Sequence, residues 1–269
     1  MARPLRLELP DALWHVTARG NERKPVFRDE HDYETFLDVL GAVVARFGWR
    51  LHAYVLMPNH YHLVFTTPLP TLSKGMRQLG GVYTQRFNKR WSRSGHLFQG
   101  RFFSLHVERD AHLLELVRYT ALNPVRARLV EDPGAWRWSS YRATAGIEPS
   151  PAFLDASFVR DQFRSRRGSP GRAFQEFVRA AGPYDPWEEV RHQVFLGSEE
   201  FFAERLSETR DRKPTTGISA RQIRGAGLTV DEAWRRLRGA PGTPDVPVRT
   251  RDLFCLLLHE EFFATYREV

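Results

Sequence analysis

The chain has 269 residues, 42% of them hydrophobic, so it is long enough for one large or two modest domains and apolar enough to bury a core. Its 40 Lys and Arg residues outnumber its 32 Asp and Glu residues, and the net charge of +8 favours a polyanionic partner. A single cysteine, Cys255, excludes a disulfide framework within the chain, and no apolar run is long enough to cross a membrane.

The type of basic residue and the N-terminal sequence sharpen these expectations. Only four of the 40 basic residues are lysines. Arginine binds phosphate through a planar fork of donors, although a genome-wide bias toward arginine also contributes to this ratio. The first residues lack the apolar block of a secretory signal, so we expect a cytoplasmic protein.

The first elements in the chain are a strand and a helix. Residues 14–19 alternate as a strand does, and Gly20-Asn21 ends it. Asp29 can cap a helix with apolar residues at helical spacing, and Gly48 can end it.

Four more elements and a third helix follow. Two strands, a helix and a strand are predicted over residues 51–57, 60–67, 72–91 and 97–107. Pro58-Asn59 makes the turn between the first two strands, and Gly100 interrupts the last one. Asp110 is expected to cap the third helix and Pro124 to limit it.

This order predicts an α+β fold with a ferredoxin-like (RRM-like) four-stranded antiparallel sheet and helices on one face. We expect this domain over residues 10–145, with a boundary near residues 148–151. Residues 146–269 are predicted to form a mostly helical C-terminal extension, in which residues 210–217 are a linker and residues 219–237 and 250–266 could hold helices.

His60-Tyr61-His62 is the sharpest chemical feature. Side chains at i and i+2 of a strand share a face, so both imidazoles could bind one divalent ion, with a further ligand from elsewhere. A chance His-x-His pair is the competing interpretation.

The third helix offers that ligand and a nucleophile. Tyr119 and Asn123 are four residues apart and share a helical face. A tyrosine hydroxyl can attack phosphorus, and an amide oxygen can bind Mg²⁺ or Mn²⁺. Taken singly, Tyr119 could equally be a half-buried aromatic residue and Asn123 a helix-ending residue before Pro124.

Four segments carry a family resemblance. Residues 53–64 (AYVLMPNHYHLV) look like the HUH block of single-tyrosine transposases, and residues 116–127 (LVRYTALNPVRA) resemble their catalytic-tyrosine helix. Residues 15–21 (HVTARGN) and 138–141 (WSSY) match in the same order. The chain is most similar to the REP-associated tyrosine transposases, over about residues 10–145.

The resemblance implies a metal-dependent endonuclease and strand transferase for single-stranded DNA at hairpin-forming repeats. His60, His62 and Asn123 would hold Mg²⁺ or Mn²⁺, and Tyr119 would form a 5′-phosphotyrosine. Such an enzyme would act as a monomer or homodimer at the bacterial nucleoid. Arg118 and nearby arginines could favour the phenolate of Tyr119.

A set of polar and basic residues could guide DNA, although a solvated surface explains each of them equally well. They are Arg19, Asn21, Arg23, Lys24, Arg86, Lys89, Arg90 and Arg101. Tyr141 and His52 are interpreted as packing and structural residues.

Two other functions stay open at this point. One is a catalytically idle nucleic-acid-binding or regulatory protein on the same fold. The other is a zinc-dependent hydrolase, which the absence of a third His, Asp or Glu at motif spacing disfavours.

Overall fold

The computed structural model describes residues 8–164, 168–180, 190–191, 195–198 and 200–201. Two compact units divide the chain: Glu8–Glu188 is one, and Met1–Leu7 with Glu189–Val269 is the other. The linker and helices predicted over residues 210–266 lie outside the described residues.

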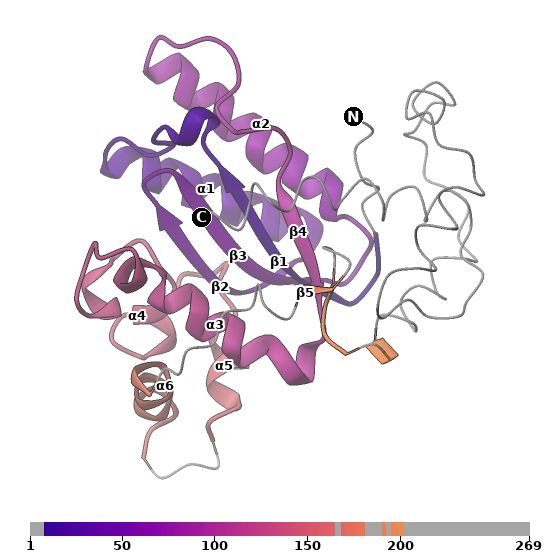
Figure 1. The fold of residues 1–269 in the computed structure, drawn as a ribbon, viewed down its shortest axis with the longest axis vertical. Helices are drawn as coiled ribbons and strands as arrows, with labels where there is room; N and C mark the ends of the chain where they lie inside the picture. The colour runs from indigo at the N-terminus through magenta and orange to yellow at the C-terminus, as the bar shows by residue number, and fades with distance from the viewer. Residues whose placement is uncertain (1–7, 165–167, 181–189, 192–194, 199, 202–269) are drawn as a thin grey trace, which may run out of the picture. The chain divides into compact units, whose positions relative to one another are not determined.

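Figure 1 shows the elements of the first unit. In chain order they are β1 (Ala12–Arg19), the 3-10 turn η1 (Asn21–Arg23), α1 (Glu30–Phe47), β2 (Arg50–Met57), β3 (His60–Thr67), α2 (Leu72–Arg90), β4 (Phe103–Val107), α3 (Arg109–Arg126), η2 (Pro133–Ala135), α4 (Tyr141–Thr144), α5 (Ala156–Asp161) and α6 (Pro170–Arg179). In the second unit, β5 (Val190–Arg191) pairs antiparallel with β6 (Phe195–Leu196).

The sheet of the first unit has the order β2-β3-β1-β4, and all its pairings are antiparallel. β1 lies between β3 and β4, although α1, β2 and α2 separate these strands in the sequence. Each helical crossover therefore skips one strand, as in the split β-α-β arrangement. The predicted α+β fold with a ferredoxin-like sheet is confirmed.

α1 and α2 cover one face of this sheet, as expected for a ferredoxin-like fold, and α3 covers the other face. The Tyr61 ring lies 4.8 Å from Phe36 of α1, whereas the adjacent His62 faces Asn123 of α3. Every residue of β1 is buried. A strand buried on both sides needs cover on both sides, and α3 supplies the second layer.

The ends of the predicted helices follow local chemistry. The Asp29 side chain accepts a hydrogen bond from the Asp32 amide at the start of α1, and Gly48 ends α1 at φ 64°. α3 differs from the prediction, since its N-cap is Glu108 rather than Asp110 and it continues through Pro124 to Arg126.

β4 is shorter than the strand predicted over residues 97–107. Gly100 turns the backbone at φ 71°, and the residues before it pair with the end of β1. The Gln99 amide donates to the Arg19 carbonyl, and the Asn21 amide donates to the Leu97 carbonyl, both at 2.8 Å. This pairing joins the loop before β4 to the loop after β1.

Residues after α3 close the free edge of β2. Val55 bridges to Ser139, Leu51 bridges to Leu154, and the Leu56 amide donates to the Trp138 carbonyl at 2.9 Å. Residues 146–164 and 168–180 therefore belong to the same compact unit as the sheet, beyond the boundary expected near residue 145. The described part of this extension is helical, as α5 and α6 show.

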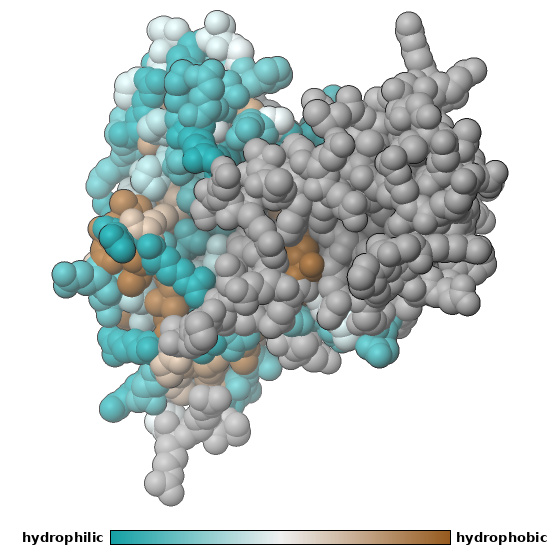
Figure 2. All heavy atoms as spheres, viewed as in Figure 1, coloured by the Kyte–Doolittle hydropathy of each residue, from teal (hydrophilic) through white to brown (hydrophobic). Residues whose placement is uncertain are grey.

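The surface of the first unit is polar around α1 and α2 and shows apolar side chains near α4 (Figure 2). Within the described residues, no helix combines the length and the apolar character that crossing a membrane requires.

Candidate functional site

The face of the sheet under α3 gathers polar side chains from two neighbouring strands. In the β1–β3 register, Thr17 lies opposite His62 and Arg19 lies opposite His60. Paired residues of an antiparallel sheet point to the same side, and so do residues two apart on one strand. His15 therefore shares this face, and it is 1% exposed.

Each histidine of the His60/His62 pair has its Nδ1 atom in a hydrogen bond. Nδ1 of His60 lies 2.7 Å from Asn59 Oδ1, and Nδ1 of His62 lies 3.0 Å from Nε2 of His15. The two rings meet edge to face with centroids 5.1 Å apart. This arrangement leaves the Nε2 atoms of both residues for another partner.

The three histidines are held in their neutral form. Burial lowers the pKa of His15 to about 4. Burial, with a smaller effect of the Arg19 charge, lowers the pKa of His60 to about 4. The pKa of His62 lies well below 6.5, first because of burial and then because of the charges of His60, His15 and Arg19. Neutral imidazoles keep the lone pairs that metal binding requires.

α3 brings Tyr119 and Asn123 to the histidines. The Tyr119 ring meets His62 nearly at a right angle, with centroids 5.7 Å apart, and lies 6.2 Å from His15. The Asn123 amide nitrogen lies 3.5 Å from Nε2 of His62, and the Asn123 side chain also hydrogen-bonds His60. The structure therefore brings together the four residues that the sequence singled out for metal binding and attack.

The donor set fits a divalent cation with oxygen and nitrogen ligands. The Nε2 atoms of the two imidazoles and one amide oxygen, that of Asn123, can contribute, and water can complete the shell. Among the described residues there is no group of three or more His, Cys, Asp or Glu that could hold a metal ion. A closed structural zinc site is therefore a poor fit to this part of the chain.

Arg126, rather than Arg118, lies beside the candidate nucleophile. The Arg126 guanidinium is 4.8 Å from the centre of the Tyr119 ring. Arg118 is instead paired with Glu115 on its own helix and covers the Phe177 ring of α6 at 4.7 Å. The positive charge near the Tyr119 phenol therefore comes from Arg126, two helical turns further along α3, and not from Arg118.

The residues after β1 take two different positions. Arg19 is 8% exposed and lies opposite His60 in the sheet, so it belongs to the site rather than to a surface loop. Asn21, Arg23 and Lys24 are exposed, and Lys24 is paired with Glu22.

Asn59 connects this loop with the site. Its side-chain nitrogen donates to the Arg23 carbonyl at 3.2 Å, and its own carbonyl accepts from the Gly20 amide at 2.8 Å. Because Asn59 Oδ1 also contacts His60, one side chain joins a metal-ligand candidate to the basic loop.

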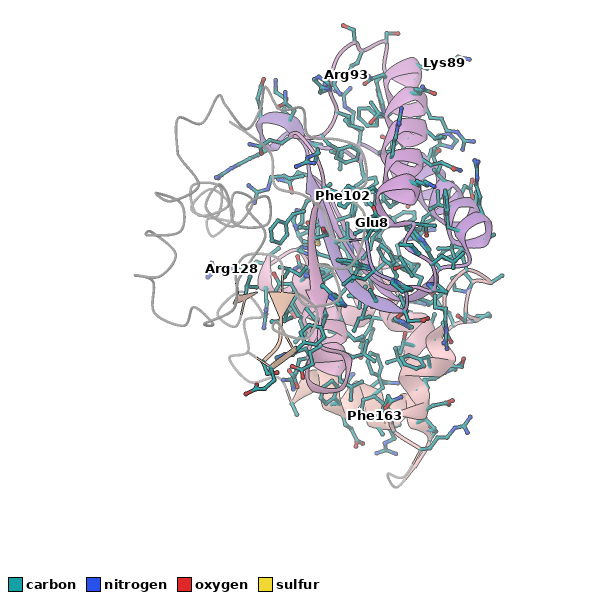
Figure 3. The ribbon with its side chains drawn as sticks, turned by 90° about the vertical axis from the view of Figure 1, so that its right-hand side faces the viewer. Glu8, Lys89, Arg93, Phe102, Arg128 and Phe163 are labelled. Atoms are coloured by element: carbon teal, nitrogen blue, oxygen red, sulfur yellow. The ribbon has the colours of Figure 1, made fainter. Side chains whose placement is uncertain are left out.

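The basic residues of α2 fall into two groups, which differ in whether they make ion pairs among the described residues. Arg86 and Lys89 are exposed, as is Arg101 before β4, and Figure 3 shows Lys89 with Arg93 at one end of the molecule. Arg90 instead contacts Asp29 at 2.5 Å and Asp32 at 2.7 Å. Arg90 thus makes ion pairs with both carboxylates, and its predicted contact with DNA stays a prediction.

Tyr141 and His52 are packing residues, as interpreted from the sequence. Tyr141 is 1% exposed and its ring packs on Phe174. Burial raises the pKa of its hydroxyl. His52 is 1% exposed and makes a 2.8 Å hydrogen bond with Thr66.

Sequence reasoning missed the site positions of His15 and Asn59. His15 was visible as part of an alternating strand that also presents Arg19 on the same face. Only the β1–β3 register shows that this face is the one that carries His62.

Comparisons with known proteins find similarity over part of the chain. Residues 9–121 match the family model described as "Transposase IS200 like". A solved structure described as a REP-associated tyrosine transposase bound to a REP hairpin is 20% identical, covers 58% of this chain and 94% of that chain, and has a TM-score of 0.47. A candidate transposase from Deinococcus radiodurans R1 is 21% identical, covers 46% of this chain and 95% of that chain, and has a TM-score of 0.32. No curated protein matches the chain.

The matched segment holds the whole sheet, both histidines of the pair and Tyr119. Residues 9–121 of this chain are thus similar to the IS200-like transposases.

Proposed function

We propose that this chain is a metal-dependent endonuclease and strand transferase for single-stranded DNA, which forms a 5′-phosphotyrosine on Tyr119. The observation that carries the proposal is the position of Tyr119 beside His62. Their ring centroids are 5.7 Å apart, and Asn123, one helical turn further on, reaches the same imidazole. A nucleophile next to neutral metal-ligand candidates is the arrangement that phosphoryl transfer needs.

His60, His62 and Asn123 would hold Mg²⁺ or Mn²⁺. When bound, the ion would neutralise charge that develops on the scissile phosphate. Neutral imidazoles suit this role because they need no deprotonation at pH 7.

Tyr119 would make the covalent bond. Its hydroxyl oxygen attacks phosphorus, the bond from phosphorus to the 3′ oxygen breaks, and the phenol proton is balanced by protonation of the leaving 3′ oxygen. The products are a 5′-phosphotyrosine and a free 3′-hydroxyl. Attack of a 3′-hydroxyl on the phosphotyrosine reverses the step and joins strands without a nucleotide energy source.

Covalent capture tests the proposal. End-labelled single-stranded hairpins from the DNA that flanks the gene are incubated with the full chain and Mg²⁺ or Mn²⁺, and adducts are separated on denaturing gels. We expect an adduct with the wild type and none with Tyr119→Phe, which keeps the ring and its packing. Tyr141→Phe is the matched control, because the Tyr141 hydroxyl is buried without a hydrogen-bond partner and its loss should leave the adduct intact.

Other results would select other functions. Hairpin binding without any adduct in either metal would favour a catalytically idle binding protein. Hydrolysis that survives Tyr119→Phe would favour a hydrolase that uses the histidines alone.

A further inference from the structure

We propose that His15 is a positioning residue of this site, which holds His62 in the form with hydrogen on Nδ1 and a lone pair on Nε2. The inference deepens the proposed function and rests on it in one respect: the Nε2 lone pair is what a metal ion would use. The sequence placed His15 in a strand and in the segment 15–21 that resembles the transposase family, but gave it no role of its own.

Two contacts of the His62 ring point to the direction of donation. The His15 Nε2 and His62 Nδ1 atoms are 3.0 Å apart, so one hydrogen lies between them. On the other side of the ring, the Asn123 amide nitrogen, a donor, faces Nε2 across 3.5 Å. A donor at Nε2 requires a lone pair there, and the hydrogen of the neutral ring is then on Nδ1. His62 therefore donates to His15.

His15 is well placed to hold this orientation. It lies in the middle of β1, paired with Val64 of β3 and Leu105 of β4, so the sheet fixes its backbone on both sides. Its ring is nearly parallel to that of His62, at 13° and 5.2 Å between centroids. The same ring meets Tyr119 edge-on. One buried side chain thus contacts both a metal-ligand candidate and the candidate nucleophile.

Loss of His15 should have the effect of losing any residue that hydrogen-bonds a metal ligand and orients it. Loss of such a partner lowers metal affinity about 10–100-fold. His15→Phe keeps a flat ring and removes the acceptor. His15→Gln keeps an amide oxygen that can reach the position of Nε2 and accept the hydrogen bond.

The control variant is His52→Phe on β2, which β3 separates from the strand of His15. His52 is as buried as His15 and also makes one hydrogen bond, but its partner is Thr66 and its ring packs on Phe158. A change seen in His15→Phe but not in His52→Phe is therefore specific to the contact with His62.

The first measurement uses the metal-free full chain. Long-range ¹H–¹⁵N NMR correlations on histidine-labelled protein distinguish the two neutral forms of His62, whose signals are assigned by their loss in His62→Gln. We expect hydrogen on Nδ1 in the wild type and in His15→Gln, and a mixture of forms in His15→Phe. Hydrogen on Nε2 in the wild type would overturn the inference, whether or not the variants fold.

The second measurement is Mn²⁺ affinity by titration calorimetry. We expect about 10–100-fold weaker binding for His15→Phe, partial recovery for His15→Gln and no change for His52→Phe. Equal affinity of His15→Phe and the wild type would overturn the positioning role while leaving the proposed function intact. A wild type that binds no Mn²⁺ and forms no adduct would contradict the proposed function, and the NMR pattern would still decide the role of His15.

Discussion

His60 and His62 owe their properties to burial more than to their neighbours' charges. Both rings are neutral because removal from water disfavours the imidazolium, and the Arg19 charge adds to that effect. The positive charge of Arg19 beside the metal-ligand candidates would repel a metal ion. A bound phosphate would offset the charges of both Arg19 and the ion. The electrostatics of the residues therefore suit a ternary arrangement of protein, metal ion and DNA.

The first prediction concerns the ligands. His60→Ala or His62→Ala should reduce adduct formation by about 10³-fold or more, because charge stabilisation by a metal ion supplies several kcal/mol. Hairpin binding should persist, since phosphate contacts are spread over many arginines. Asn123→Ala should be milder, because two imidazoles remain and water can fill the gap. Single-turnover assays measure the rates, and exposed His96→Ala is the control; a His60→Ala protein as fast as wild type would contradict the assignment.

The second prediction concerns the residue over the Tyr119 ring. Arg126→Ala should slow adduct formation about tenfold, or about 1.4 kcal/mol, because a positive charge beside the phenol favours its ionised form. Arg126→Lys should recover part of the rate. Arg128→Ala, two residues further along and also exposed, is the control. Equal rates for the Arg126 and Arg128 variants would show that this contact has no part in the chemistry.

At the scale of elements, one buried carboxylate joins the start of α1 to the end of α2. Asp32 is 2% exposed. It accepts hydrogen bonds from the Arg28 amide, from Arg90 and from Trp91 Nε1. Arg28 and Arg90 also lie 4.8 Å from the Trp91 ring, which packs the charged groups against an aromatic surface. Asp32 thus connects the start of α1 to the end of α2 on the face of the sheet that carries Tyr61.

The third prediction tests this junction. Asp32→Ala should lower the free energy of unfolding by about 3 kcal/mol, because it leaves the partly buried Arg28 amide and Trp91 Nε1 without this acceptor and removes one of the two carboxylates that pair with Arg90. Asp38→Ala, on the exposed side of the same helix, should change it by less than about 0.5 kcal/mol. Urea denaturation followed by fluorescence measures both. A similar small change for the two variants would mean that the Asp32 network adds little to stability.

At the scale of the molecule, basic side chains gather at the end of the sheet where β1 finishes. Figure 1 shows η1 and the C-terminal end of α2 at the end of the sheet where β1 finishes, and Figure 3 shows Lys89 and Arg93 there. Because β3 begins with His60 at this same end, a nucleic acid that follows the basic residues would reach the histidines.

The fourth prediction concerns the form of the nucleic acid. A single-stranded hairpin should bind better than a perfect duplex of the same sequence, since base stacking on aromatic side chains needs unpaired bases. Affinity should fall with salt, with a slope of about −3.5 on logarithmic axes if about five phosphates are contacted. Fluorescence anisotropy at several salt concentrations measures both effects. Tighter binding of the duplex at equal salt would contradict the proposed substrate.

The sequence by itself determined most of the helices and strands, and which residues within one element share a face. Hydrophobic spacing and capping residues such as Asp29 and Gly48 are local signals, and from them β1, β2, β3, α1 and α2 were predicted close to their observed bounds, whereas β4 was predicted too long. The spacing of Tyr119 and Asn123, and of His60 and His62, is also local, so each pair could be placed on one face before the fold was known.

The tertiary structure alone decided which faces meet. The register of β1 against β3 puts His15 and Arg19 beside His60 and His62, and no local pattern encodes that register. Packing placed α3 on the opposite face from α1 and α2, which carries Tyr119 to the histidines. It also paired Arg90 with the buried carboxylate of Asp32. These outcomes depend on contacts between residues far apart in the chain, and long-range burial, rather than local propensity, selects them.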